Sequence, residues 1–166
     1  MIDLIPLDEE RLRALAADPA AALAGLGCNA GAVAEIVGSV ARATLHHQGR
    51  TGARAPWIGY LARCGGGAVI GTCAFMGPPS DGAVEIAYFT FPGHERRGHG
   101  SAMAGALVGI ALADPAVREV IAHTLPEENA STRLLRRHGF RLRGAVSADE
   151  HGEVWRWSLG RAEGRP

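Results

Sequence analysis

The chain has 166 residues, a length typical of a single globular domain. Hydrophobic residues account for 47% of it and charged residues for 20%, which is enough apolar material for a buried core and excludes intrinsic disorder. Lys and Arg total 17, as do Asp and Glu, so the formal net charge is zero and no nucleic acid or other polyanion is expected as a partner.

Cysteine usage and the N-terminal sequence indicate the compartment. Cys28, Cys64 and Cys73 form neither a CxxC pair nor a zinc-type set, so we expect no disulfide framework and no metal. The N-terminus, MIDLIPLDEERLR, carries acids where a signal peptide has cations, and no apolar run reaches the roughly 18 residues of a membrane span. We therefore expect a cytoplasmic protein with no membrane partner.

All 17 cations are Arg, which together with 23 Gly indicates a G+C-rich genome.

Hydrophobic periodicity predicts alternating strands and helices along the whole chain. Strands are predicted at Ile2–Pro6, Trp57–Arg63, Ala68–Phe75, Val84–Phe91, Val117–His123, Arg141–Val146 and Val154–Leu159. Helices are predicted at Leu7–Ala17, Ala32–His46, Ser101–Ala113 and Asn129–His138. This order predicts a mixed α/β (α+β) fold over residues 1–166, in which helices flank a mixed sheet.

A glycine-rich loop follows the strongest predicted strand, VEIAYFTF, which is closed by Pro92. In the loop sequence GHERRGHGSAM, Gly98 and Gly100 allow close backbone approach, and Arg96 and Arg97 add positive charge. A loop of this kind before a helix can hold a phosphate, although an ordinary surface loop is the alternative. A dinucleotide fold is less expected, because GHGSAM lacks the third small residue of GxGxxG.

Glu85 is an acid in an otherwise apolar strand face. Period-two alternation places it on the same face as Ala87, Phe89 and Phe91. A carboxylate beside aromatic side chains is a candidate general base, and the alternative is a solvated acid near the strand end.

A basic segment follows in PEENASTRLLRRHGFRLRG. Asn129 and Ser131 open a predicted helix there, and five arginines lie within residues 133–143 with no acid among them. Such a run is usually a solvated face, but beside a phosphate-type loop it could also contact a phosphorylated ligand.

Together, VEIAYFTFP, RRGHGSAMAGALV and ENASTRLLRRHGF resemble the GNAT superfamily of N-acetyltransferases, and within it the branch of the bacterial ribosomal-protein N-terminal acetyltransferases. The resemblance implies one acetyltransferase domain over residues 1–166. It implies a mostly antiparallel sheet of about seven strands that is splayed between the fourth and fifth strands and flanked by four helices. It also implies transfer of acetyl from acetyl-CoA, as cosubstrate, to a primary amine by direct attack.

The resemblance further implies where acetyl-CoA binds. Its pyrophosphate is expected at Arg96, Arg97, Gly98, His99, Gly100, Ser101 and Ala102. The family's loop pattern fits two registers, Arg97–Ala102 and Glu95–Gly100. The pantetheine arm is expected to contact backbone groups of Phe89, Thr90 and Phe91, and the side chain of either Asn129 or Glu128.

The catalytic residues implied by the resemblance are Glu85, which accepts the proton of the amine through water, and Ser131, which donates to the departing thiolate. Many relatives carry a Tyr acid where this chain has Leu135, so Ser131 takes that role. The alternative for Ser131 is an N-terminal helix cap.

The acceptor is expected to be a small-molecule amine or a peptide N-terminus, held by Gly25–Gly31, Gly49–Trp57 and Ser147–His151, the segments that line this site in the superfamily. A homodimer is possible. Two alternatives are a non-catalytic module that binds acyl-CoA as a sensor, and a nucleotide-binding oxidoreductase that binds NAD(P)H.

Overall fold

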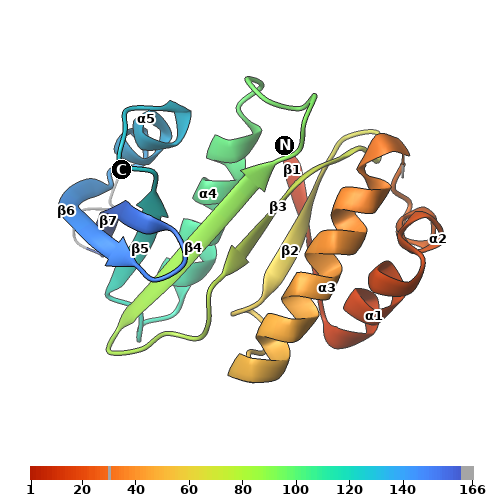
Figure 1. Cartoon of the computed structure of the whole chain (residues 1–166), viewed down its shortest axis with the longest axis horizontal. Coiled ribbons are helices and arrows are strands. Elements are labelled where there is room, and N and C mark those ends of the chain that lie inside the picture. Colours follow the sequence, from red (N-terminus) through yellow and green to blue (C-terminus); the bar gives the residue numbers. More distant parts are fainter. Residues whose placement is uncertain (30, 162–166) are drawn as a thin grey trace.

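The structure is a computed structural model that describes residues 1–29 and 31–161 (Figure 1). Its strands are β1 (Ile2–Pro6), β2 (Gly59–Cys64), β3 (Val69–Phe75), β4 (Ala83–Thr90), β5 (Glu119–Thr124), β6 (Arg141–Ala148) and β7 (Gly152–Gly160). Its helices are α1 (Glu9–Ala17), α2 (Pro19–Gly25), α3 (Ala34–Thr51), α4 (His99–Ala113) and α5 (Ala130–Arg137), with a short 3₁₀ turn at Gly31–Val33.

The strands form one mixed sheet in the order β1-β2-β3-β4-β5-β7-β6. Every neighbouring pair is antiparallel except β4 and β5, which run parallel. The predicted mixed, mostly antiparallel sheet of seven strands is therefore confirmed.

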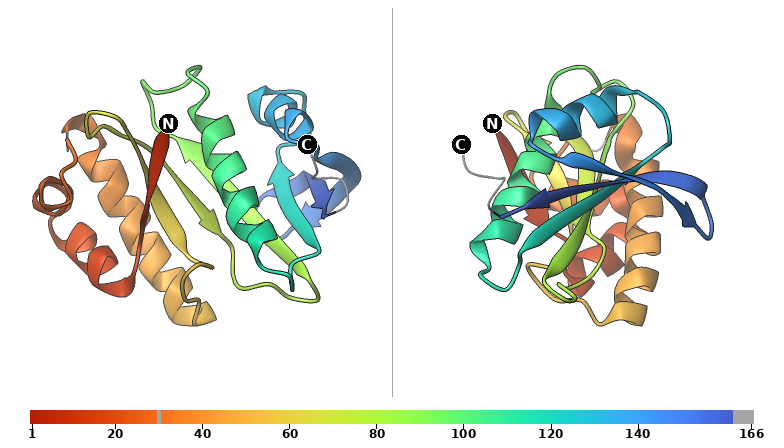
Figure 2. Two further views of the ribbon diagram at one scale, coloured as in Figure 1. Left: turned by 180° about the vertical axis from the view of Figure 1, so that it is seen from behind. Right: turned by 90° about the vertical axis from the view of Figure 1, so that its left-hand side faces the viewer.

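The helices cover the two faces of the sheet unequally. α1, α2 and α3 lie on one face, and α4 and α5 lie on the other (Figures 1 and 2). Each face has its own core: Met103 and Leu107 of α4 belong to one, whereas Leu12 of α1 and Val37 of α3 belong to the other. Both cores depend on strands that alternate their side chains between faces.

The central strand β4 shows this alternation. Val84 and Ile86 are buried in the core under α4, and Phe91, just past the strand, is buried in the core under α3. Between Glu85 and Phe91 on the α3 face, Ala87 and Phe89 remain exposed, Phe89 by 51%. A strip in the middle of the sheet is thus left uncovered on the α3 side.

Close packing of β3, β4 and α4 requires a glycine at position 71. A Cβ there would collide with the backbone oxygen of Phe89 and would come within 3.0 Å of the Met103 side chain. Gly71 therefore lets α4 lie directly against the β3–β4 ladder.

β4 and β5 separate soon after they begin to pair. Their parallel register covers only three residue pairs, from Ala83 with Glu119 to Glu85 with Ile121. Beyond Glu85, β4 stays on β3 and β5 stays on β7, so a gap opens between the two strands. This is the expected splay between the fourth and fifth strands.

The structure corrects two predicted helices. The described residues form five α-helices where four were predicted, because the seven-residue α2 is too short to show an apolar periodicity. Its signal was Asp18 followed by Pro19, an N-cap with proline at the first helical position. α3 also continues to Thr51, past the predicted end at His46, before Gly52 ends it in a left-handed conformation.

Among the described residues, no helix combines the length and apolar character needed to cross a bilayer.

Burial protects one cysteine from thiol reagents. Burial raises the pKa of the Cys73 thiol to about 12, whereas Cys64 is only half-buried. At about pH 8 this lowers the thiolate fraction of Cys73 roughly a thousandfold relative to an unperturbed thiol. We expect Ellman's reagent to modify Cys73 only after denaturation.

Because the unfolded thiol ionises first, Cys73 also makes the free energy of unfolding fall as pH rises from about 9 toward 12.

The matched variants are Cys64→Ser and Cys73→Ser. Cys64→Ser should lose the fast phase of native thiol modification, and Cys73→Ser should keep it. A fast phase that disappears in Cys73→Ser would contradict the burial argument.

Candidate active site

The N-terminus of α4 is open to a ligand. Side chains of Asp8, Asp18 and Asn129 cap α1, α2 and α5, whereas no side chain caps α3, which continues directly from the 3₁₀ turn at Gly31–Val33, or α4, which begins after a loop. The first N–H groups of an α-helix have no acceptor within the helix, so those of His99, Gly100 and Ser101 are available. Backbone N–H groups at such an end favour an anion, and a phosphate is the usual one.

The loop before α4 has the backbone shape and charge that a diphosphate requires. Arg96 (φ 59°) and Gly98 (φ 79°) adopt left-handed conformations, which are typical of loops whose N–H groups form an anion-binding concavity. Arg96 and Arg97 are exposed. Burial, and then nearby basic groups including Arg97, lower the pKa of His99. The Arg96 and Arg97 guanidinium groups add positive charge beside this helix end, and the Glu95 carboxylate accepts a hydrogen bond from Gly93 N–H in the same loop.

The first turn of α4 is also fixed against α5. Ser101 Oγ and His138 Nε2 are 2.8 Å apart, and a Cβ at Gly100 would lie 3.2 Å from Leu134 Cδ1. The structure thus gathers the predicted residues 96–102 around one helix end, and it uses the Ser101 hydroxyl for helix packing.

The backbone of β4 corrects the expected pantetheine contacts. Phe91 N–H donates to Ile70 O and Phe91 O accepts from His94 N–H, so both of its groups are used within the protein. Phe89 pairs with Thr72 of β3. Because backbone groups alternate in direction along a strand, the groups that face the gap belong to Ile86, Tyr88 and Thr90. Of the predicted residues, only Thr90 faces the gap.

Ser131 meets a residue that sequence reasoning missed. Its hydroxyl lies 2.8 Å from the hydroxyl of Tyr88, which reaches across the gap from β4 to α5. The alternative role of Ser131 as a helix cap is excluded, because Asn129 Oδ1 accepts the cap hydrogen bond from Thr132 N–H. The only sequence signal for Tyr88 was its position three residues after Glu85. In a strand, this spacing places the two side chains on opposite faces.

Glu85 also has an unexpected partner. Its Oε1 lies 2.8 Å from Nδ1 of His123, which projects from β5 just where the strands separate. The carboxylate is 39% exposed, so it is partly buried, and it is paired with a histidine that the strand pattern did not indicate. Glu85 and His123 lie on the uncovered α3 side of the sheet, whereas Tyr88 and Ser131 lie on the α4 side.

Two residues of the α5 motif are committed to the helix itself. Asn129 forms a reciprocal capping box with Thr132. Glu128 binds the Arg136 guanidinium with both oxygens at 2.6 Å, and Arg136 also lies over the Trp157 ring. The arginine-rich segment is therefore partly neutralised, which weakens its expected role as a second phosphate contact.

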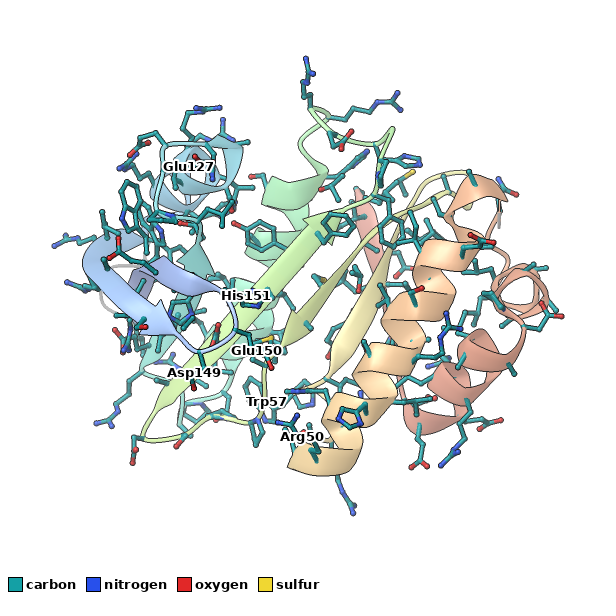
Figure 3. All side chains as sticks on the ribbon, in the orientation of Figure 1. Arg50, Trp57, Glu127, Asp149, Glu150 and His151 are labelled. Carbon is teal, nitrogen blue, oxygen red and sulfur yellow. The ribbon has the colours of Figure 1, made fainter. Side chains whose placement is uncertain are left out.

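Two expected acceptor segments flank the uncovered strip of β4. The β6–β7 hairpin leaves the sheet on the α3 side (Figure 2), and Figure 3 shows its turn residues Glu150 and His151 over β4, in the direction of Trp57. Trp57 lines a pocket of about 230 Å³ together with His47 and Met76. Met76 N–H donates to Glu85 O, so this pocket adjoins Glu85.

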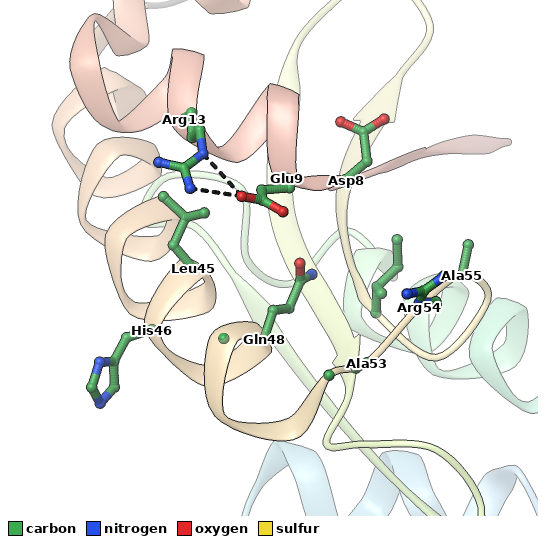
Figure 4. Close-up of a pocket in the computed structure, with 12 residues that line it drawn as sticks. Asp8, Glu9, Arg13, Leu45, His46, Gln48, Ala53, Arg54 and Ala55 are labelled. Atoms are coloured by element: carbon green, nitrogen blue, oxygen red, sulfur yellow. Dashed lines mark hydrogen bonds and ion pairs between the residues drawn. The ribbon is translucent and has the colours of Figure 1, made fainter.

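A larger pocket adjoins this one and shares Gln48, Ala53 and Ile58 with it. Its volume is about 670 Å³, and it is lined by the start of α1, the end of α3 and the following loop, including the Glu9–Arg13 ion pair (Figure 4). It contains no residue of β4 or α5. The third expected acceptor segment, Gly25–Gly31, includes Ala30, which lies outside the described residues.

Within residues 1–29 and 31–161, no three His, Cys, Asp or Glu side chains are grouped as a metal site would need.

Comparison with known proteins gives the family. A family model described as an acetyltransferase (GNAT) domain matches residues 4–141. The chain belongs to the GNAT family of acetyltransferases. A search of curated proteins gives no match.

Solved structures share the GNAT fold at low sequence identity. RimL, a ribosomal L7/L12 α-N-protein acetyltransferase in complex with coenzyme A, is 19% identical over 96% of this chain and 93% of its own, with a TM-score of 0.65. The aminoglycoside acetyltransferase AAC(6')-Ib, also with coenzyme A, is 18% identical over 98% and 96%, with a TM-score of 0.66. A chimera of the spermidine N-acetyltransferase SpeG from Vibrio cholerae and hSSAT is 11% identical over 97% and 96%, with a TM-score of 0.64.

The open helix end can be tested with Gly98, the N-cap residue of α4, and Gly109 within the helix. Gly98→Ala places a side chain at φ 79°, which costs roughly 1–2 kcal/mol or moves the loop. If restoring the binding conformation of the loop costs this much, coenzyme A affinity should fall by about tenfold, because about 1.4 kcal/mol of binding free energy corresponds to a factor of ten in Kd. Isothermal titration calorimetry with coenzyme A measures the change.

Gly109→Ala is the control, because Gly109 is exposed in the same helix and a Cβ there meets nothing within 4 Å. It should leave coenzyme A affinity unchanged and raise the free energy of unfolding by up to about 1 kcal/mol. Equal effects of the two variants on affinity would count against the helix end as the phosphate site.

Proposed function

We propose that this protein is an N-acetyltransferase that transfers acetyl from acetyl-CoA to a primary amine by direct attack. The observation that carries the proposal is the arrangement around the β4–β5 gap. The Glu85–His123 pair lies on one side of it, and the Tyr88–Ser131 pair lies on the other. A proton acceptor and a hydrogen-bond donor on opposite sides suit an amine and a thioester that meet in the gap.

Residues on the α4 side provide groups that fit acetyl-CoA. The N–H groups of His99, Gly100 and Ser101, with the charges of Arg96 and Arg97, would hold the diphosphate. Backbone groups of Tyr88 and Thr90 would pair with the amides of the pantetheine arm, as a strand edge pairs with an extended ligand. Asn129 keeps its side-chain NH₂ group for the same arm, because only Oδ1 serves the cap.

On the α3 side, we assign proton removal to Glu85 and His123 acting together. With Nδ1–H donating to the Glu85 carboxylate, His123 presents a lone pair on Nε2. The carboxylate orients the ring and stabilises the imidazolium that forms, as the acid of a catalytic triad does. This revises the role of Glu85 from a base acting through water to the partner of the base.

The reaction balances with these groups. The amine nitrogen attacks the thioester carbonyl carbon and forms the N–C bond while His123 Nε2 takes the amine proton. The C–S bond then breaks, and its electron pair leaves on sulfur as the coenzyme A thiolate, which accepts a hydrogen bond from Ser131. A β4 backbone N–H facing the gap polarises the carbonyl.

The required proton acceptor depends on the amine. A lysine-like amine of pKa about 10.4 costs roughly 4–5 kcal/mol to deprotonate at pH 7, whereas an α-amino group near 8 costs only about 1 kcal/mol. The named relatives act on a protein α-amino group, an aminoglycoside and spermidine, which share a primary amine. We propose a small-molecule amine or a peptide N-terminus as acceptor, at the pocket of Trp57 and His47. A homodimer stays a prediction.

The first test is ligand binding followed by turnover. Calorimetric titration should show binding of acetyl-CoA and none of NADPH. An amine panel containing peptides with free N-termini, polyamines and aminoglycosides should then release coenzyme A in an amine-dependent way. Binding without release from any amine would favour the sensor alternative, and binding of NADPH instead would overturn the proposal.

The second test separates Glu85 from His123. We expect His123→Ala to lower kcat/KM about a hundredfold, the lower end for loss of a general base, and Glu85→Gln to lower it at least tenfold because the ring loses its orientation. His46→Ala is the control, since His46 is exposed on α3 and is not among the residues that line the Trp57 pocket, although it lines the adjoining larger pocket.

Profiles of kcat/KM between about pH 6 and 9 distinguish the outcomes. Loss of activity in Glu85→Gln but not in His123→Ala would return the proton-accepting role to Glu85 acting through water. Full activity in both variants would show that neither residue removes the proton.

A further inference from the structure

We propose that Tyr88 is a positioning residue for the departing thiolate, holding the Ser131 hydroxyl so that its proton points into the β4–β5 gap. This inference rests on the proposed function and adds a residue to its leaving-group side. The bond that carries it joins the two hydroxyl oxygens at 2.8 Å.

The surroundings of this bond fix both partners. Tyr88 is half-buried on the α4 face of β4, and a Cβ at Gly100 would lie 4.0 Å from its ring. Ser131 is in the first turn of α5, which is fixed by the Asn129 cap and by the Ser101–His138 contact. The two hydroxyl groups therefore meet at a defined point between the open end of α4 and the start of α5.

The direction of the hydrogen bond decides what Ser131 can do. A phenol is a better donor than an aliphatic alcohol, and Tyr88 keeps its proton because burial raises its pKa above the ordinary value of 10.0. With Tyr88 donating, the Ser131 oxygen is the acceptor and its own proton is free for another partner. Hydrogen bonds in series polarise one another, so Ser131 becomes a stronger donor.

The chemistry of the leaving group suits this chain of donors. An ordinary thiol has a pKa near 8.5 and a phenol near 10, so the thiolate does not remove the Tyr88 proton. The pair therefore stabilises the negative sulfur by hydrogen bonding, with no net proton transfer from the protein. The pair also supplies the phenol that the sequence lacks at Leu135, from a different element.

The experiment measures ionisation of the coenzyme A thiol bound to the protein, which needs no acceptor. The ultraviolet thiolate absorbance is titrated in the coenzyme A complex and compared with the desulfo-coenzyme A complex, so that protein groups cancel. Tyr88→Phe should raise the midpoint of the bound thiol by about one pH unit, a tenfold weaker stabilisation of the thiolate. Ser131→Ala should raise it at least as much.

Two further variants make the result specific. In Ser131→Ala, adding Tyr88→Phe should change nothing more, because Tyr88 acts through Ser131. Tyr60→Phe is the matched control, since Tyr60 is the other tyrosine of the chain and its buried hydroxyl donates to Pro56 O at 2.7 Å, away from the gap. Tyr60→Phe should leave the midpoint of the bound thiol unchanged. Circular dichroism should show that every variant keeps the wild-type fold.

The outcomes separate this inference from the proposed function. If the wild-type protein binds no coenzyme A, both are overturned. If it binds and Tyr88→Phe titrates like wild type, only the role of Tyr88 is overturned. Additive shifts in the double variant would also overturn it, because Tyr88 would then act on sulfur without Ser131.

Discussion

β4 and β5 stay hydrogen-bonded over only three residue pairs before they diverge, and the rest of the candidate site depends on that separation. Unpaired backbone groups inside a sheet are unfavourable unless they find partners. Each strand keeps a full ladder on its other side, β4 with β3 and β5 with β7, so the gap can persist without loosening the sheet. The Tyr88–Ser131 hydrogen bond then connects the two halves across it.

A single strand gives the gap its two chemical sides. Because side chains alternate along β4, Glu85 and Tyr88 point to opposite faces. On the α4 face, Tyr88 meets α5 beside the open end of α4, where we propose that the anionic cosubstrate binds. On the α3 face, Glu85 meets His123 beside an uncovered strip where an amine can approach. The proposed transfer needs two substrates from two directions, and the alternation provides for both.

The N-termini of α4 and α5 differ in how their backbone N–H groups are used. Asn129 accepts a hydrogen bond from Thr132 N–H and so caps the first turn of α5, which supports Ser131. α4 begins at Gly98 with no capping side chain, so its N–H groups stay available to a ligand. Glu128 and Arg136 form an ion pair that joins the segment before α5 to the last turn of the helix. Arg136 is therefore paired within the protein and is a less available phosphate contact.

The sequence by itself determined the local features: the positions of the strands along the chain, the face shared by Glu85 and Phe89, the glycine loop before α4, and the α5 motif that contains Ser131. Each of these follows from spacing within one element. Only the tertiary structure decided which groups meet, since Glu85 and His123 are 38 residues apart and Tyr88 and Ser131 are 43 apart. It also decided that Phe91 uses its backbone within the protein, because strand register depends on a partner strand that the local pattern does not contain.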